Sequence, residues 1–333
     1  MSSVSKSLVH LSNRSLLRLA GIETADFLQG LITNDINLLK EGATSLYSLF
    51  LNTRGRVLYD TIIYKAQEET FFVECDIKVL SNLVKHLKMY KLRKKVDIQT
   101  MENQMNVWTV FDNDVISSKR NTNDKNPDLE GKIFPCGAMD DKSSKLVDNI
   151  SFFSDPRLSD LGLRILARSD VSGGEISQHL APNTTALKNI QNYRAFRYQL
   201  GIGEGVQDFP PGVPLPLEIN CDYLHGVSFH KGCYIGQELT ARTHHTGVIR
   251  KRLMPLTFDG TSEKPLEYDT KILNDSEKTV GKILGQEGSS GLGLIRIAEA
   301  LASKTLTAGA LDVRVVKPHW WPQESQKVEA SAS

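Results

Sequence analysis

The chain has 333 residues, of which 40% are hydrophobic and 24% charged, and its formal net charge is +1. This length predicts two or three domains, and the balanced charge gives no basis for bulk nucleic-acid binding. No stretch approaches the roughly 20 consecutive apolar residues that cross a bilayer. An integral membrane protein is therefore excluded, and we expect neither nucleic acid nor membrane as a partner.

The cysteines predict reduced thiols. They are widely spaced and form no C-x-x-C pair: Cys75, Cys136, Cys221 and Cys233. A disulfide framework is therefore not expected, nor is a zinc or iron–sulfur site built from cysteines alone. Reduced thiols are typical of a cytosolic or organellar interior. The stretch before Glu23 contains Ser and basic residues but no acid, which is the composition of a transit peptide.

The first half of the chain predicts a mixture of strands and helices. An apolar segment containing Leu8, Leu16 and Leu19 predicts a strand that ends at Gly21, and Thr24 is expected to cap the helix that follows. The next predicted elements are a β-hairpin over 46–64, a strand over 70–75, a helix capped by Asp76 and carrying Leu80, Leu83 and Leu87, and a strand over 106–111.

The helix after Asp76 ends in a basic run that contains Lys88, Lys91, Arg93, Lys94 and Lys95. Such a run most often covers a solvated face, and the alternative is attraction of an anionic partner. Further on, residues 117–145 turn polar and predict a long surface excursion.

The second half predicts a helical region and then a small barrel. A strand is expected over 161–167 and a helix over 187–200 that stops at Gly201, followed by an irregular segment over 201–220. Short strands with turns follow, at 252–258, 271–273, 280–286, 291–297 and 311–316. Trp320 and Trp321 are expected to anchor the end of the last domain.

The most informative residue is Cys233, which is flanked by Gly232 and Gly236, with Lys231 and Arg242 on either side. Glycines let the backbone approach a ligand, and the two cations are expected to lower the pKa of the thiol. One alternative is a small buried hydrophobic residue. Another is nucleophilic catalysis with His230, His244 or His245 as the base, which we disfavour.

Lys231-Gly232-Cys233-Tyr234-Ile235-Gly236-Gln237-Glu238 resembles the KGCYxGQE signature of the YgfZ-type family, folate-binding relatives of the glycine-cleavage aminomethyltransferase, or T-protein. Residues 27–35 and 214–218 are similar to that family's N-terminal and central signatures. The likeness is to the mitochondrial branch, whose members assist iron–sulfur cluster assembly.

The resemblance implies an α+β fold with two interleaved α/β domains around a central channel and a C-terminal β-barrel. The implied division is a discontinuous first domain over 8–47 and 150–246 that carries the signature, a second α/β domain over 48–149, a barrel over 247–322 and a disordered tail over 323–333.

The resemblance also implies a non-enzymatic assembly factor of the mitochondrial matrix that assists 4Fe-4S maturation and is a monomer when alone. Clusters need about four protein ligands, so Cys233 is expected to be one ligand of a cluster shared with an A-type carrier protein. The motif residues around it are Lys231, Gly232, Tyr234, Gly236, Gln237 and Glu238.

A tetrahydrofolate pocket is implied as well. Glu218 is the expected partner of the pterin edge, and the cations expected at a glutamate tail are Arg242, Arg250 and Arg252. The alternative function is a folate-dependent aminomethyltransferase. T-proteins carry an acidic pair after a glycine turn, and here Tyr59 replaces the first acid, so Asp60 is the catalytic candidate under that alternative.

Overall fold

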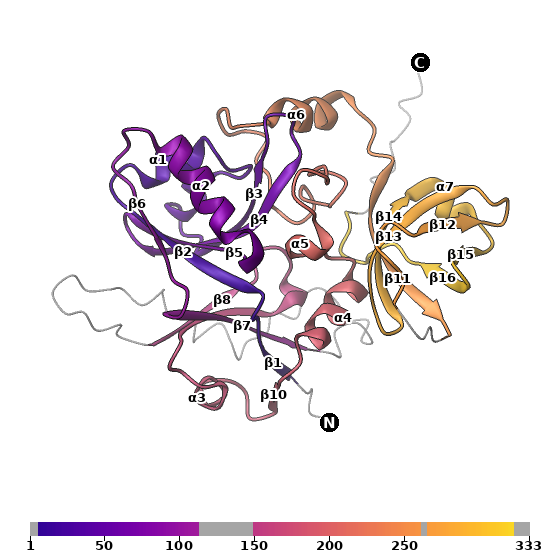
Figure 1. Ribbon diagram of the computed structural model, residues 1–333, viewed down its shortest axis with the longest axis horizontal. Coiled ribbons are helices and arrows are strands. Elements are labelled where there is room, and N and C mark those ends of the chain that lie inside the picture. The colour runs from indigo at the N-terminus through magenta and orange to yellow at the C-terminus, as the bar shows by residue number, and fades with distance from the viewer. Residues whose placement is uncertain (1–5, 113–148, 261–264, 323–333) are drawn as a thin grey trace, which may run out of the picture.

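The computed structural model describes residues 6–112, 149–260 and 265–322 (Figure 1). The strands of these residues form two five-stranded sheets and a closed six-stranded barrel. The expected α+β class with a C-terminal barrel is confirmed. The predicted excursion over 117–145, Cys136 and the tail over 323–333 lie outside the described residues.

The first sheet has the strand order β3-β4-β5-β2-β6 and is antiparallel throughout. Its strands are β2 (Arg14–Ala20), β3 (Ser45–Leu51), β4 (Val57–Gln67), β5 (Thr70–Asp76) and β6 (Asp97–Thr100). The helices α1 (Thr24–Gln29) and α2 (Leu80–Lys91), with the short 3-10 helices η1 (Ile36–Leu39) and η2 (Ile77–Val79), share one apolar cluster with this sheet. The predicted hairpin and the helix after Asp76 are both present, and Asp76 caps η2, which leads into α2.

The second sheet has the order β10-β1-β7-β9-β8, with only the β1–β10 pair parallel. Its strands are β1 (Lys6–His10), β7 (Met105–Asp112), β8 (Ile150–Ser154), β9 (Leu163–Arg168) and β10 (Thr184–Leu187). The 3-10 helix η4 (Ser159–Leu161), α3 (Gly173–Gln178), α4 (Ile190–Leu200) and α5 (Gly205–Asp208) complete this region. Gly201 ends α4 in the left-handed conformation, as predicted.

The two sheets share a core. One buried cluster contains Leu16, Leu49 and Ile62 from the first sheet together with Val107 and Phe153 from the second. The chain passes between the sheets within a few residues, because β1 ends at His10 and β2 begins at Arg14. The two α/β units are thus interleaved in sequence and fused in space.

Two local predictions were wrong. The apolar segment expected to be a single strand forms β1 and β2, which belong to different sheets. Thr24 does not cap α1, because Glu23 occupies the N-cap position and Thr24 is fully buried. The proposed domain limits remain a prediction, and the limit between residues 47 and 48 falls inside β3.

The barrel has the order β11-β14-β13-β12-β15-β16. Its strands are β11 (Lys251–Asp259), β12 (Lys271–Asn274), β13 (Thr279–Glu287), β14 (Ser290–Arg296), β15 (Leu306–Ala308) and β16 (Leu311–Val315), with α7 (Ile297–Ala302) between β14 and β15. Trp321 packs in the barrel core, and Trp320 Nε1 donates a hydrogen bond to the Leu200 oxygen at 2.8 Å. The tryptophan pair was expected to anchor the end of the last domain, and it also ties the barrel to α4. Within the described ranges, no helix is long and apolar enough to span a bilayer.

Candidate functional site

The Cys233 loop, residues 228–236, lies against the N-terminal signature, residues 27–35. Lys231 Nζ donates hydrogen bonds of 2.7 Å to three backbone oxygens, those of Gln29, Ile32 and Asn34. These carbonyls lie at and just beyond the end of α1, where a helix leaves its acceptors unpaired. Lys231 thus joins two signatures that are about 200 residues apart in the sequence.

Backbone bonds extend this contact on both sides of Lys231. The Ser228 amide donates to the Thr33 oxygen at 3.1 Å, and the Ile235 amide donates to the Gly30 oxygen at 3.1 Å. Burial lowers the pKa of Lys231 to about 8, and Asp35 partly opposes that shift. Because the ammonium is surrounded by carbonyls, Lys231 acts as a structural brace. The sequence prediction treated it as a cation acting on Cys233.

Asn34 braces the other side of the junction. Its Nδ2 atom donates to the Tyr47 oxygen at 2.8 Å and to the His225 oxygen at 2.7 Å. Thr33 Oγ1 donates to the Gly226 oxygen at 2.6 Å. A buried amide with two backbone acceptors fixes the separation of the segments it joins. From the sequence, Asn34 was identified only as part of the N-terminal signature, without a structural role.

Gly236 packs against the turn between β3 and β4. Its φ of +80° is left-handed, and a Cβ there would lie 2.3 Å from the Asn52 oxygen. Opposite it, Gly55 has a φ of +76°, and a Cβ on Gly55 would lie 3.0 Å from the Gly236 oxygen. This contact explains why both positions favour glycine, and it sets α6 (Gln237–Thr246) beside the hairpin tip (Figure 1).

The other motif residues have distinct places. Gln237 Oε1 accepts a hydrogen bond from the Tyr234 amide at 3.0 Å, which closes the turn into α6. Tyr234 packs against the shared core, and Lys231 Nζ lies 5.1 Å from its ring centroid. Glu238 is exposed in the first turn of α6, where an acid suits the positive end of a helix.

Cys233 itself is exposed at the outer side of this braced loop. A Cβ added to the neighbouring Gly232 would also meet no atom within 4 Å. The other two cysteines of the described residues are buried, and burial raises the pKa of Cys75 and of Cys221. Among these three thiols, only Cys233 is accessible to a second molecule.

Histidines lie near the loop. His244 stacks on Phe229 with ring centroids 3.5 Å apart, and His245 meets the His244 ring edge-on. Both histidines belong to the last turn of α6. In the part of the chain that the structure describes, no group of three or more His, Cys, Asp or Glu side chains can hold a metal ion. Cys233 is therefore not grouped with other metal-ligating side chains there.

Glu218 is a half-buried carboxylate beside the hairpin. Burial raises its pKa, while the nearby cations Lys251, Lys282 and Arg56 oppose the shift. Its side chain forms no hydrogen bond or ion pair with any residue that the structure describes. A partly desolvated acceptor of this kind fits a ligand that brings N–H donors.

The three expected arginines do not form one group. Arg252 is buried, and its guanidinium pairs with both oxygens of Asp222 at 2.8 Å and lies 3.8 Å from the Tyr223 ring centroid. Its donors are therefore already used within the protein. Arg242 on α6 and Arg250 just before β11 are exposed, so either is free to meet a ligand or partner.

Asp60 belongs to a buried ionic network between the sheets. Its carboxylate accepts from Arg14 at 3.1 Å and from the Gly205 amide at 3.1 Å. The network continues through buried ion pairs among Glu74, Asp155, Arg157, Arg164, Arg197, Glu204 and Asp208. Sequence reasoning missed these residues, although Arg14, Glu74 and Arg164 each lie in a strand most of whose residues are apolar.

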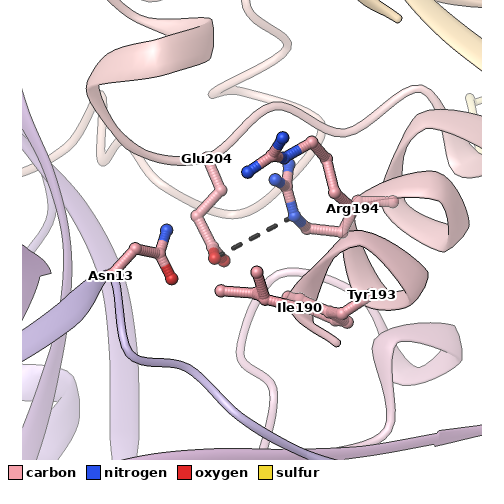
Figure 2. A pocket seen from close by; sticks show the side chains of 6 residues that line it. Asn13, Ile190, Tyr193, Arg194 and Glu204 are labelled. Atoms are coloured by element: carbon pink, nitrogen blue, oxygen red, sulfur yellow. Dashed lines mark ion pairs between the residues drawn. The ribbon is translucent and has the colours of Figure 1, made fainter. Parts of the chain in front are cut away.

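Glu204 is the centre of this network. Burial alone would raise its pKa, but the guanidinium groups of Arg164, Arg157 and Arg197 hold it well below the ordinary value. Figure 2 shows Glu204 directed toward the arginines of α4, beside a pocket also lined by Asn13 and Ile190. The pocket holds about 10 Å³ for the centre of a water-sized molecule, which matches one water and is far too small for a pterin.

Two family models match the chain. Residues 4–111 match the GCVT N-terminal domain, and residues 250–323 match the C-terminal beta-barrel domain of CAF17. The chain is 38% identical to the mouse protein named iron-sulfur cluster assembly factor IBA57, mitochondrial, over 94% of this chain and 84% of that one. This chain belongs to the IBA57 family.

Other members agree with that assignment. The human IBA57 is 36% identical over 95% of this chain and 85% of its own length. The Dictyostelium discoideum homologue is 34% identical over 77% of this chain and 63% of its own length. Both are named mitochondrial. The fold of this chain is similar to that of the aminomethyltransferase T of the Bartonella henselae glycine cleavage system, with a TM-score of 0.71 and 13% sequence identity. The match covers 96% of this chain and 87% of that one. The predicted kinship to the T-protein is thus confirmed at the level of fold.

Proposed function

We propose that this protein is an assembly factor of the mitochondrial matrix that promotes 4Fe-4S maturation by lending the Cys233 thiolate to a cluster held jointly with an A-type carrier. The observation that carries the proposal is the exposure of Cys233 on a loop whose neighbours are fixed by Lys231, Gly236 and Gln237. A rigid loop presents the thiol at a defined place, which a shared cluster requires.

Ligand number supports a shared site. A cluster needs about four protein ligands, and the described residues supply a single accessible thiol with no second metal-ligating side chain grouped beside it. The partner would provide the remaining thiolates. The isolated protein is then a monomer without a cluster of its own, and complex formation creates the site.

The buried position of Asp60 favours a non-enzymatic role. Both of its oxygens are used by Arg14 and Gly205, and Arg14 is itself fully enclosed. A carboxylate that neutralises a buried guanidinium is not available to move a substrate proton. We therefore rank the aminomethyltransferase reaction below the assembly role.

A folate site remains the second candidate because one observation favours it. Glu218 is a half-buried carboxylate that forms no hydrogen bond or ion pair with the described residues, as the amino-pyrimidine edge of a pterin requires. If tetrahydrofolate binds, Glu218 would hold the pterin edge and Arg242 or Arg250 its glutamate tail, while Arg252 would keep its pairing with Asp222. Calorimetry with tetrahydrofolate tests this, and binding that is unchanged in Glu218→Gln would exclude the role.

The main proposal is tested by maturation of a 4Fe-4S enzyme in a reconstituted system. Cys233→Ser should abolish the stimulation by this protein, while Cys136→Ser should retain it. Thiol labelling under native conditions should modify Cys233 rapidly and Cys75 and Cys221 slowly. Equal stimulation by the Cys233→Ser and Cys136→Ser variants would exclude the proposed ligand.

A further inference from the structure

The end of α2 carries an exposed apolar residue in an unfavourable backbone conformation. Leu92 has φ +50° and ψ −114°, and the Lys94 amide donates to the Lys91 oxygen at 2.9 Å. These values describe a type II′ turn with leucine at the position that favours glycine. The side chain is 86% exposed, so no packing within the protein repays this conformation.

Two further apolar side chains lie near Leu92. Met89, one turn earlier on α2, is 60% exposed, and Ile22 is 70% exposed. Ile22 belongs to this surface because Gly21 packs against the Lys95 oxygen and the Lys95 amide donates to Glu23 at 2.7 Å. The opposite face of α2 is buried through Leu80, Leu83 and Leu87. Met89 and Leu92 therefore lie at the end of a helix whose inner face is already packed, and Ile22 lies in the neighbouring turn between β2 and α1.

Cations flank Met89 and Leu92 in the sequence, and five of them, at positions 88, 91, 93, 94 and 95, lie within three residues of one or the other. Between Asp76 and Asp97 the sequence contains seven Lys or Arg residues and no acid: Lys78, Lys85, Lys88, Lys91, Arg93, Lys94 and Lys95. The neighbouring acids are already engaged, since Glu23 lies 3.9 Å from Lys94 and Asp97 lies 3.7 Å from Arg18. The surface is thus apolar at its tip and positive around it.

We propose that this surface, the α2 tip formed by Ile22, Met89, Leu92 and the surrounding cations, docks the protein onto an anionic lipid bilayer. Exposed apolar side chains enter the boundary between headgroups and acyl chains, while Lys and Arg meet anionic headgroups. Backbone strain that presents a side chain to solvent is typical of a binding element. The sequence expectation of no membrane partner rested on the absence of a spanning segment, whereas this attachment is peripheral.

An acidic protein is the other class of partner that the charges would fit. The lipid surface is favoured because Leu92 and Met89 are large apolar side chains that are 86% and 60% exposed within a run of cations. Three apolar residues at a tip suit shallow insertion into lipid. They offer less to a protein interface, which is organised around buried aromatic or Arg anchors.

The test is co-sedimentation of the full chain with vesicles of phosphatidylcholine alone or mixed with phosphatidylglycerol. We expect binding to the mixed vesicles only. Leu92→Gly should weaken it about ten-fold, although glycine suits the turn and should leave the fold at least as stable. Replacing Lys88 and Arg93 by Gln should weaken binding roughly five-fold per charge, while the same change at Lys278 and Lys304, exposed on the barrel, should have no such effect.

Three outcomes would overturn the proposal. They are no binding of the wild-type chain to the mixed vesicles, binding that Leu92→Gly and the double Gln variant leave unchanged, and tighter binding to polyglutamate than to the mixed vesicles. The last outcome would assign the surface to an acidic protein. Since Leu92→Gly is expected to fold normally, a circular dichroism spectrum like that of the wild type separates lost binding from lost structure.

Discussion

The ammonium of Lys231 lies 2.7 Å from the backbone oxygen of Asn34, which is 197 residues earlier in the chain. Asn34 in turn donates to the His225 oxygen at the start of the same region. The two family signatures are therefore one structural unit, in which residues 27–35 form the support and the Cys233 loop is held upon it. Most of the KGCYxGQE residues serve to position a single exposed thiol.

Replacing Lys231 by Met should loosen that unit. Three carbonyls lose their shared donor, and we expect a loss of about 2 kcal/mol in the free energy of unfolding. Labelling of Cys233 should also lose its single-exponential time course as the loop samples several conformations. Urea denaturation and thiol labelling measure these effects, with Lys278→Met on the barrel surface as the control. An unchanged free energy of unfolding would show that the Lys231 hydrogen bonds make no net contribution to stability.

The two glycines of the signature should respond differently to alanine. Gly236→Ala places a Cβ 2.3 Å from the Asn52 oxygen at a left-handed φ, so we expect a loss of at least about 2 kcal/mol. Gly232→Ala meets no atom within 4 Å, so its stability should change by less than about 0.5 kcal/mol. Thermal unfolding of both variants measures the contrast. Equal losses would contradict the described packing of the loop on the hairpin.

The substitution Asp60→Ala should lower the free energy of unfolding and should not remove a catalytic group. Arg14 would lose one of its two carboxylate partners while remaining buried, which costs about 3 kcal/mol. We expect a lower midpoint of urea denaturation and, in the folded fraction, unchanged stimulation of cluster maturation. A stable variant that had lost tetrahydrofolate-dependent aminomethyl transfer would instead move the enzymatic alternative to first place.

The buried ionic network makes the free energy of unfolding depend on pH in the acidic range. Glu204 and Asp155 have pKa values lowered from 4.5 and 3.8, because their arginine partners outweigh burial. Between the folded and unfolded pKa values the unfolded chain binds more protons, so the free energy of unfolding falls as the pH is lowered. The contribution of these two carboxylates to the free energy of unfolding should be fully present above about pH 5 and should be lost progressively below it. Urea titrations across this range test the sign, and Glu204→Gln should flatten the slope.

Several elements were predictable because their signals are local. Alternating strands in the barrel, the hairpin around Gly55 and the stop at Gly201 each follow from residues within one element. The helix cap at Thr24 was not predicted correctly, because a buried environment rather than capping chemistry determines that position. The separation of β1 from β2 was also missed, since nothing local to Leu11–Asn13 indicates that the chain changes sheets there.

The candidate site was predictable only in part, because much of it depends on contacts between residues far apart in the sequence. The exposure of Cys233 depends on how its loop packs against residues 27–35, and the hydrogen bonds of Lys231 and Arg252 depend on partners elsewhere in the chain. A cation near a thiol in sequence is not necessarily a cation acting on it. Arg14, Glu74 and Arg164 lie in strands most of whose residues are apolar, and a charge in such a strand is the signal that would have predicted a buried network.

The most direct test of a shared cluster is anaerobic reconstitution with iron and sulfide, read by visible absorbance and iron counting. Three samples are compared, namely this protein alone, the A-type carrier alone and the two together, with Cys233→Ala replacing the wild type in a parallel mixture. We expect the lone chain to stay colourless, and the mixture to acquire a cluster spectrum that depends on Cys233. A stoichiometric cluster on the lone chain, or one on the mixture that survives Cys233→Ala, would contradict the shared-ligand proposal.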